Sequence, residues 1–238
     1  MLRKIKRLLM AVFIVSILSV IGAYAGYRWF RANSTNSNQY IVEWLNDAEN
    51  HPNYEAVALL RCGDAPFIMP TTGFIGLFWR DSSAPYNVMR RHTALDIFGN
   101  GALGTVPVYA AYDGYLTRQD TWLSTVIIRH DDPLQAGRTI WTYYTHMASL
   151  DGSQNYISDA FPQGTSNQFV AQGTLLGYQG LYNPPFPIAM HVHFSIVTSH
   201  PNGSFKNEAV LANTLDPSPY LGFDVNANTA THPATCRE

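Results

Sequence analysis

The sequence predicts a mainly β protein, with one antiparallel β domain preceded by an N-terminal transmembrane helix and short helices. Hydrophobic residues make up 46% of the 238 residues and charged residues only 13%, so most of the chain can bury a core. Glycine (17), proline (14) and tyrosine (14) are plentiful, which favours a turn-rich β protein over a helical bundle. From about Phe67 onward, short runs of strand-forming residues alternate with turn residues.

The N-terminal segment predicts a membrane span. A charge-free run from Leu8 to Tyr27 covers roughly 30 Å as a helix, the thickness of a bilayer core. Basic residues are denser before this run than after it, which favours a cytoplasmic N-terminus; they are Arg3, Lys4, Lys6 and Arg7 before it, and Arg28 and Arg31 after it. The alternative is a signal peptide cleaved after Ala25, although its apolar region would be longer than usual. In both cases the rest of the chain is exported.

Composition divides the chain into four parts: residues 1–31, 32–66, 67–223 and 224–238. The first holds the basic tip and the anchor or signal peptide. The second begins with a small, polar stretch (32–39) that reads as a linker, followed by one or two short helices broken near Pro52. The third is the β domain, and the fourth is a polar tail that we expect to be loose apart from Cys236.

Two cysteines, Cys62 and Cys236, are an even count in an exported chain. An oxidising compartment allows them to form a disulfide. The alternative is two unpaired thiols.

Within the β domain, each strand is predicted from a short apolar run. "VPVYAAYDGYLTRQ" has strand-type residues on both sides of a turn signal at Asp113-Gly114. "STVIIRH" and "RTIWTYYTHM" are separated by "DDPLQAG" and predict a pair of strands. "QFVAQGTLLGYQG" contains brief apolar pieces that end at glycines, "HVHFSIV" predicts a final strand, and "LDPSPYL" closes the domain.

The segment "HVHFSIV" places two histidines in an apolar run. If it is a strand, its side chains alternate, so His191, His193, Ser195 and Val197 share one face. Val192, Phe194 and Ile196 then form an apolar face suited to a core. A helix would instead separate the two histidines by about 200°. Adjacent imidazoles on one polar face suit a metal or catalytic site, and the alternative is a pair of surface histidines on a half-exposed strand.

Two further segments carry residue types suited to chemistry. "RRHTALDIFG" holds His92 and Asp96 four residues apart, on one face of either a strand or a helix, and both are good zinc ligands. Such a pair arises easily by chance. His146 follows an aromatic strand in "TYYTHM", where a lone histidine is more often structural. The remaining histidines have no partner pattern, and His130 is most simply a turn residue; they are His51, His130, His200 and His232.

These segments, taken in order, resemble the lysostaphin-type (LytM-like) zinc metallopeptidases, which are cell-wall endopeptidases with an antiparallel β fold. The resemblance runs from about Gly73 to Leu221 and includes "HTALD", "GTVPVYAAYDGYL", "TYYTHM", "VAQGTLLGYQG" and "HVHF" followed by "LDPSPYL". The sequence departs from the family pattern at Ala94, where a glycine is usual. It also departs at Leu181–Met190, a longer and more proline-rich loop that would border the cleft and affect substrate preference.

The resemblance implies a catalytic site. It assigns His92, Asp96 and His193 to one zinc ion per chain, leaving a fourth position for water. It assigns His146 and His191 to acid–base chemistry on the catalytic water and the reacting peptide.

The sequence therefore predicts an exported zinc metalloendopeptidase that hydrolyses peptide bonds of peptidoglycan, in the stem peptide or the cross-bridge. Its expected location is the cell membrane, as a single-pass protein with an extracytoplasmic catalytic domain, or outside the cell after signal-peptide cleavage. One alternative is a non-catalytic relative that binds cell wall or activates another wall hydrolase, and another is a structural metal-binding β domain. The net charge of −2 gives no indication of nucleic-acid binding, and the sequence does not indicate an oligomeric state.

Overall fold

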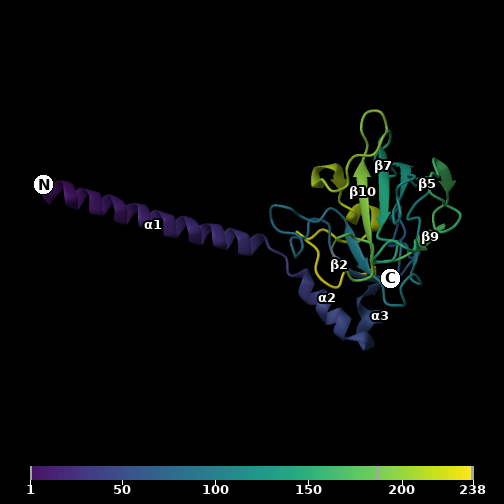
Figure 1. Cartoon of the computed structure of the whole chain (residues 1–238), viewed down its shortest axis with the longest axis horizontal. Coiled ribbons are helices and arrows are strands. Elements are labelled where there is room, and N and C mark those ends of the chain that lie inside the picture. Colours follow the sequence, from purple (N-terminus) through teal and green to yellow (C-terminus); the bar gives the residue numbers. More distant parts are fainter. Residues whose placement is uncertain (1, 186–187, 237–238) are drawn as a thin grey trace.

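The N-terminal helix stands apart from the rest of the molecule. The structure is a computed structural model of the whole chain and describes residues 2–185 and 188–236. Helix α1 (Leu2–Asn33) extends away from the β domain as one long helix (Figure 1). Its segment Val12–Asn33 is 22 residues long, is not buried in the protein and is apolar enough to cross a membrane. This helix is consistent with either a membrane anchor or a signal sequence.

Two short helices follow and pack against the sheet. Helix α2 spans Ser37–Asn46, and a 3₁₀ turn at Ala48–Asn50 leads into α3 (His51–Tyr54). Trp44 of α2 is buried against Phe74 and Phe98. The expected break near Pro52 is the start of α3, because proline is tolerated in the first turn of a helix. The expected linker (32–39) is shorter than predicted, because its first two residues belong to α1 and its last three to α2.

The strands form a mainly antiparallel β domain, as the sequence predicts. Within residues 2–185 and 188–236, nine strands make one sheet in the order β1-β2-β3-β10-β7-β6-β5-β8, with β11 paired to β10. A second, two-stranded sheet pairs β4 with β9. The bounds are β1 Glu55–Ala56, β2 Gly73–Leu77, β3 Leu95–Phe98, β4 Pro107–Tyr109, β5 Gly114–Thr117, β6 Val126–Asp131, β7 Thr139–Thr145, β8 Gln168–Val170, β9 Leu175–Tyr178, β10 His191–Thr198 and β11 Thr214–Leu215. A short helix, α4 (Ser218–Leu221), follows β11.

Strand β10 has the alternating faces that its sequence predicts. Val192, Phe194 and Ile196 are fully buried in the main hydrophobic core. Val197 on the other face packs in a second, aromatic cluster with Trp141. Both faces are therefore covered, and the histidine-bearing face is more buried than a half-exposed strand would be.

The turn signal at Asp113-Gly114 does not form a hairpin. The strands before and after it lie in different sheets, because β4 pairs with β9 whereas β5 pairs with β6 and β8. A side chain at Gly114 would lie 2.4 Å from the carbonyl oxygen of Arg129, so the glycine is required for a close strand approach. His130, expected in a turn, is buried within β6, where its Nε2 lies 2.8 Å from the Thr142 hydroxyl.

The C-terminal tail is packed and not loose as expected from its polarity. Val225 is fully buried, and the backbone on both sides of Asn226 bonds to Trp79: Trp79 N–H donates to Val225 (3.1 Å), and Ala227 N–H donates to Trp79 (2.9 Å). The His232 ring stacks on Phe78 with ring centroids 4.1 Å apart. A few well-placed backbone and ring contacts therefore hold a segment with few apolar residues.

The predicted disulfide between Cys62 and Cys236 is confirmed. The two Cα atoms lie 5.6 Å apart, and the bridge joins the domain entry to the tail across 174 residues of sequence.

Reduction of this disulfide is expected to lower the thermal stability. In the chain-entropy model, a loop of this length stabilises the folded state by roughly 4–5 kcal/mol. The measurement is thermal unfolding with and without reductant, using the Cys62→Ser/Cys236→Ser double variant as a control that reductant should not affect. Identical unfolding curves for the oxidised and reduced wild-type protein would refute a stabilising bridge.

Candidate metal and catalytic site

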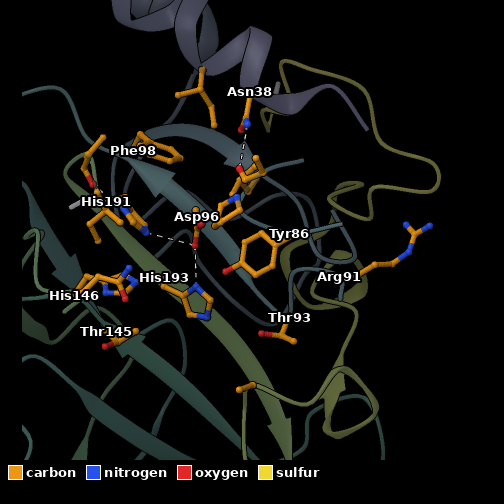
Figure 2. Close-up of a pocket in the computed structure, with 18 of the residues that line it drawn as sticks. Asn38, Tyr86, Arg91, Thr93, Asp96, Phe98, Thr145, His146, His191 and His193 are labelled. Atoms are coloured by element: carbon orange, nitrogen blue, oxygen red, sulfur yellow. Dashed lines mark hydrogen bonds and ion pairs between the residues drawn. The ribbon is translucent and has the colours of Figure 1, made fainter. Parts of the chain in front are cut away.

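The five predicted site residues come together at neighbouring strands of the main sheet, and Figure 2 shows four of them, Asp96, His146, His191 and His193. His191 and His193 lie on β10, which pairs with β3 on one side and β7 on the other. The register places His193 opposite Asp96 of β3 and opposite Thr145, the last residue of β7. His146 follows β7 directly, and His92 lies just before β3. The sheet topology thus brings together segments that are about 100 residues apart.

His92, Asp96 and His193 form a compact group of potential metal ligands. One donor atom from each lies within 4.8 Å of the others, and all three side chains are buried. Asp96 Oδ1 lies 2.8 Å from His193 Nδ1 and 3.1 Å from His92 Nε2. The two imidazole nitrogens are 3.3 Å apart. Two nitrogens and a carboxylate oxygen that converge in this way are a donor set suited to zinc.

The charges in this group favour a cation. Burial alone would raise the pKa of Asp96, but the nearby His92 and His191 and the hydrogen bond from His193 hold it well below its usual value. Burial likewise disfavours the charged form of His193, yet its contacts with Asp96 and Glu208 raise its pKa to about 10. Asp96 therefore stays ionised among these histidines, and its negative charge favours a cation at this position.

His92 is oriented by the segment that precedes it. Its Nδ1–H donates to the carbonyl oxygen of Phe78 at 3.0 Å, which turns Nε2 toward Asp96. Its backbone N–H donates to the carbonyl oxygen of Asp81 at 2.8 Å, and its own carbonyl accepts from Arg80 at 2.9 Å. The turn at residues 78–92 thus fixes both the backbone and the ring of His92.

The same turn holds the start of the N-terminal helices. The Asp81 carboxylate is fully buried and accepts hydrogen bonds from the hydroxyls of Thr35 and Ser37 and from the backbone N–H of Ser83. Arg91 donates to the carbonyl oxygen of Asn33 at 3.2 Å, and Figure 2 shows its side chain directed away from the site. The segment between α1 and α2 is therefore attached to the turn that positions His92.

His146 and His191 lie beside the group and, like His92, are held through Nδ1 by a backbone carbonyl. His146 Nδ1–H donates to the Tyr182 carbonyl at 2.8 Å, and His191 Nδ1–H donates to the Ala189 carbonyl at 2.8 Å. Their ring centroids are 4.7 Å apart. Burial lowers the pKa of both, that of His146 to about 3, so each is neutral at pH 7 with an unprotonated Nε2. Neutral imidazoles with a free nitrogen are suited to accept protons.

Two residues near the group were not predicted from the sequence. Tyr86 packs its ring 4.6 Å from that of His92, and its hydroxyl points into the space beside Asp96 and His193 (Figure 2). Burial, followed by the charges of Asp96 and Glu208, raises the pKa of Tyr86, so its hydroxyl remains a hydrogen-bond donor. Glu208 places a carboxylate oxygen 3.6 Å from His193 Nε2. Neither residue belongs to a recognisable motif, since a lone Tyr or Glu carries no spacing signal.

A cavity of about 360 Å³ is lined by Tyr86, Asp96, His146, His191, His193 and Glu208, whereas His92 is fully buried and is not among its lining residues. Asn38 and Ile41 of α2 form part of its wall, so the helix after the expected linker contributes to the cavity. The predicted cleft-bordering loop Leu181–Met190 contributes Asn183, Ile188 and Ala189; residues 186–187 of this loop lie outside the described residues. Ala94, the departure from the family pattern, is fully buried between His92 and Asp96.

Comparison with known proteins finds similarity at the level of solved structures. No family model and no curated protein matches the chain. The catalytic domain of the antimicrobial peptidase lysostaphin from Staphylococcus simulans has 18% identity and a TM-score of 0.38, over 56% of this chain and 80% of that one. Whole lysostaphin has 19% identity and a TM-score of 0.37 over 56% of this chain, which covers only 43% of lysostaphin. A mutant catalytic domain of the prophage-encoded protein EnpA from Enterococcus faecalis has 20% identity and a TM-score of 0.37, over 64% of this chain and 96% of that one.

The identities and TM-scores of these structures are low, so a function has to be inferred from the residues of the site.

Proposed function

We propose that this protein is an exported zinc metalloendopeptidase that hydrolyses peptide bonds of peptidoglycan. The observation that carries the proposal is the convergence of His92, Asp96 and His193 next to two neutral histidines, His146 and His191. A structural zinc site almost always has four protein ligands, whereas the group here has three. The two additional imidazoles, which line the same cavity without belonging to the ligand group, favour an enzyme.

In this proposal His92, Asp96 and His193 hold the zinc ion. The fit rests on the donor set, on its burial and on the 2.8 Å contact between His193 Nδ1 and Asp96 Oδ1. When bound, zinc polarises the scissile carbonyl group and makes hydroxide available near neutral pH.

The other residues of the cavity move protons and orient the substrate. The unprotonated Nε2 atoms of His146 and His191 accept a proton from the attacking water and return one to the leaving amine. The Tyr86 hydroxyl is available to donate a hydrogen bond to the carbonyl oxygen as negative charge develops there. His146 and His191 keep their orientation because their Nδ1–H groups are bonded to backbone carbonyls.

The proposed substrate follows from the motifs and the location of the domain. Cell-wall peptide is the substrate class of the family that the motifs resemble. A domain attached to α1 through residues 33–37 would act on wall close to its own membrane. The alternative is a related domain without catalysis that binds cell wall or activates another wall hydrolase.

The test combines metal analysis with turnover on purified peptidoglycan. We expect about one zinc per chain and the release of new amino groups from the wall, with the His200→Ala variant as a control because His200 is exposed and outside the cavity. Zinc without turnover would favour the non-catalytic alternative. A protein without zinc would refute the proposed function.

The N-terminal helix is expected to remain attached as a membrane anchor. Its 22-residue apolar segment is long enough to cross a bilayer. Expressed whole in a bacterium, the protein should resist extraction by salt and alkali and keep its N-terminal residues. A mature N-terminus at Gly26 would show signal-peptide cleavage and a secreted enzyme.

A further inference from the structure

The four histidines of the site differ in which ring nitrogen faces Asp96 and in which group contacts the other ring nitrogen. In His92, His146 and His191, Nδ1–H donates to a backbone carbonyl, of Phe78, Tyr182 and Ala189 respectively. These bonds are 2.8–3.0 Å long, and the Nε2 atoms of His92 and His191 face Asp96. His193 is turned the other way, because its Nδ1 faces Asp96 and its Nε2 points away from the ligand group.

The group that faces His193 Nε2 is a carboxylate. Glu208 Oε2 lies 3.6 Å from it, and the two side chains are 29% and 9% exposed. This is an ion-pair distance, and a shift of roughly 0.5 Å would make it a hydrogen bond. Glu208 also lines the cavity, so it lies at the boundary between His193 and the space for substrate.

The backbone around Glu208 is held in place. The Asn207 side chain accepts from the backbone N–H of Ala209 at 2.9 Å, and the Asn207 carbonyl accepts from the Asn213 side chain at 2.9 Å. Lys206 N–H donates to the carbonyl of Thr198, the last residue of β10, at 3.2 Å. Glu208 is therefore presented by a turn that is fastened to the strand bearing His193.

We propose that Glu208 is a positioning residue that orients His193 for metal binding through His193 Nε2. The inference rests on the proposed zinc site. For Nδ1 to offer its lone pair to a metal, the ring proton must lie on Nε2, where it needs an acceptor. A carboxylate in that place fixes the tautomer and the ring orientation and makes the ligand more basic. Glu208 thus has the role for His193 that the Phe78 carbonyl has for His92.

The test is the zinc affinity of the full-length protein in detergent, measured by competition with a chelating dye. Loss of such an outer partner typically weakens metal binding about 10–100-fold, and we expect this range for Glu208→Ala. Glu208→Gln keeps a neutral acceptor and should fall between Glu208→Ala and the wild type. Glu49→Gln removes an exposed carboxylate of the 3₁₀ turn and should leave the affinity unchanged. Thermal unfolding of the metal-free variants identifies any variant that does not fold. If Glu208→Ala does not fold, the zinc affinity of Glu208→Gln alone tests the positioning role.

The outcomes separate this inference from the proposed function. Zinc affinities of Glu208→Ala and Glu208→Gln within twofold of the wild type would overturn the positioning role while leaving the zinc enzyme intact. Unchanged zinc affinity with a raised KM would also overturn it, since Glu208 would then contact substrate. Wild-type protein that binds no zinc would overturn the proposed function and the positioning role together.

Discussion

His193→Ala is expected to abolish stoichiometric zinc binding and, with it, peptidase activity. His193 supplies one of three converging donor atoms, and its Nδ1 lies 2.8 Å from Asp96 and 3.3 Å from His92. Alanine leaves two donors, so zinc affinity should fall by more than the roughly 10–100-fold that loss of an outer partner costs. The measurement is zinc content after dialysis of the full-length protein, together with turnover on purified wall.

The control for this variant is Ser195→Ala. Ser195 lies two residues further along β10 and is fully buried, and its hydroxyl has no hydrogen-bond partner within the described part of the chain. Its replacement changes the same strand without removing a donor atom, so zinc content should remain at one per chain. A His193→Ala protein that folds and still holds one zinc would show that the ligand assignment is wrong.

The histidine-bearing strand could be predicted because its chemistry is local. In "HVHFSIV" the side-chain period of two decides which residues share a face, and no distant segment is needed to separate His193 from Val192. The position of His146 after its strand and the pairing of β6 with β7 were predicted for the same reason. Predicting that these segments converge required the family resemblance, because the residues of "HTALD" alone do not indicate that this segment pairs with "HVHF".

Elements that depend on distant partners were predicted incorrectly or missed. The Asp113-Gly114 signal is typical of a hairpin. However, β4 on one side of it pairs with β9, and β5 on the other side pairs with β6 and β8. The tail was expected to be loose because it is polar. In the structure Val225 is buried and the His232 ring stacks on Phe78. Residues 32–39 were expected to be a linker, yet the buried carboxylate of Asp81 accepts hydrogen bonds from the hydroxyls of Thr35 and Ser37.

Tyr86 and Glu208 illustrate the limit of sequence patterns at the site. Each approaches the ligand group from a turn and not from a strand with a fixed period. Their positions depend on how the segments before β3 and after β10 fold back, and that is set by individual hydrogen bonds such as those of Asn207.

His146→Ala and His191→Ala are expected to keep zinc but to lose most turnover. Neither residue belongs to the group of three converging donors, and Asp96 keeps its close contacts with His193 and His92 in both variants. Removing a positioned acid–base group costs on the order of 10²-fold or more in rate. The measurement is kcat/KM on purified wall beside zinc content, with His200→Ala as the control.

The two variants also distinguish catalytic from metal-binding roles. His191 Nε2 lies 3.6 Å from Asp96, nearer to the ligand group than His146, so its variant is the stricter test. Loss of zinc from a folded His191→Ala protein would make His191 a metal ligand. Full turnover in either variant would remove that histidine from the reaction. Because His146 and His191 face one another in the same cavity, a double variant only slightly slower than each single variant would indicate that they act on the same proton transfer.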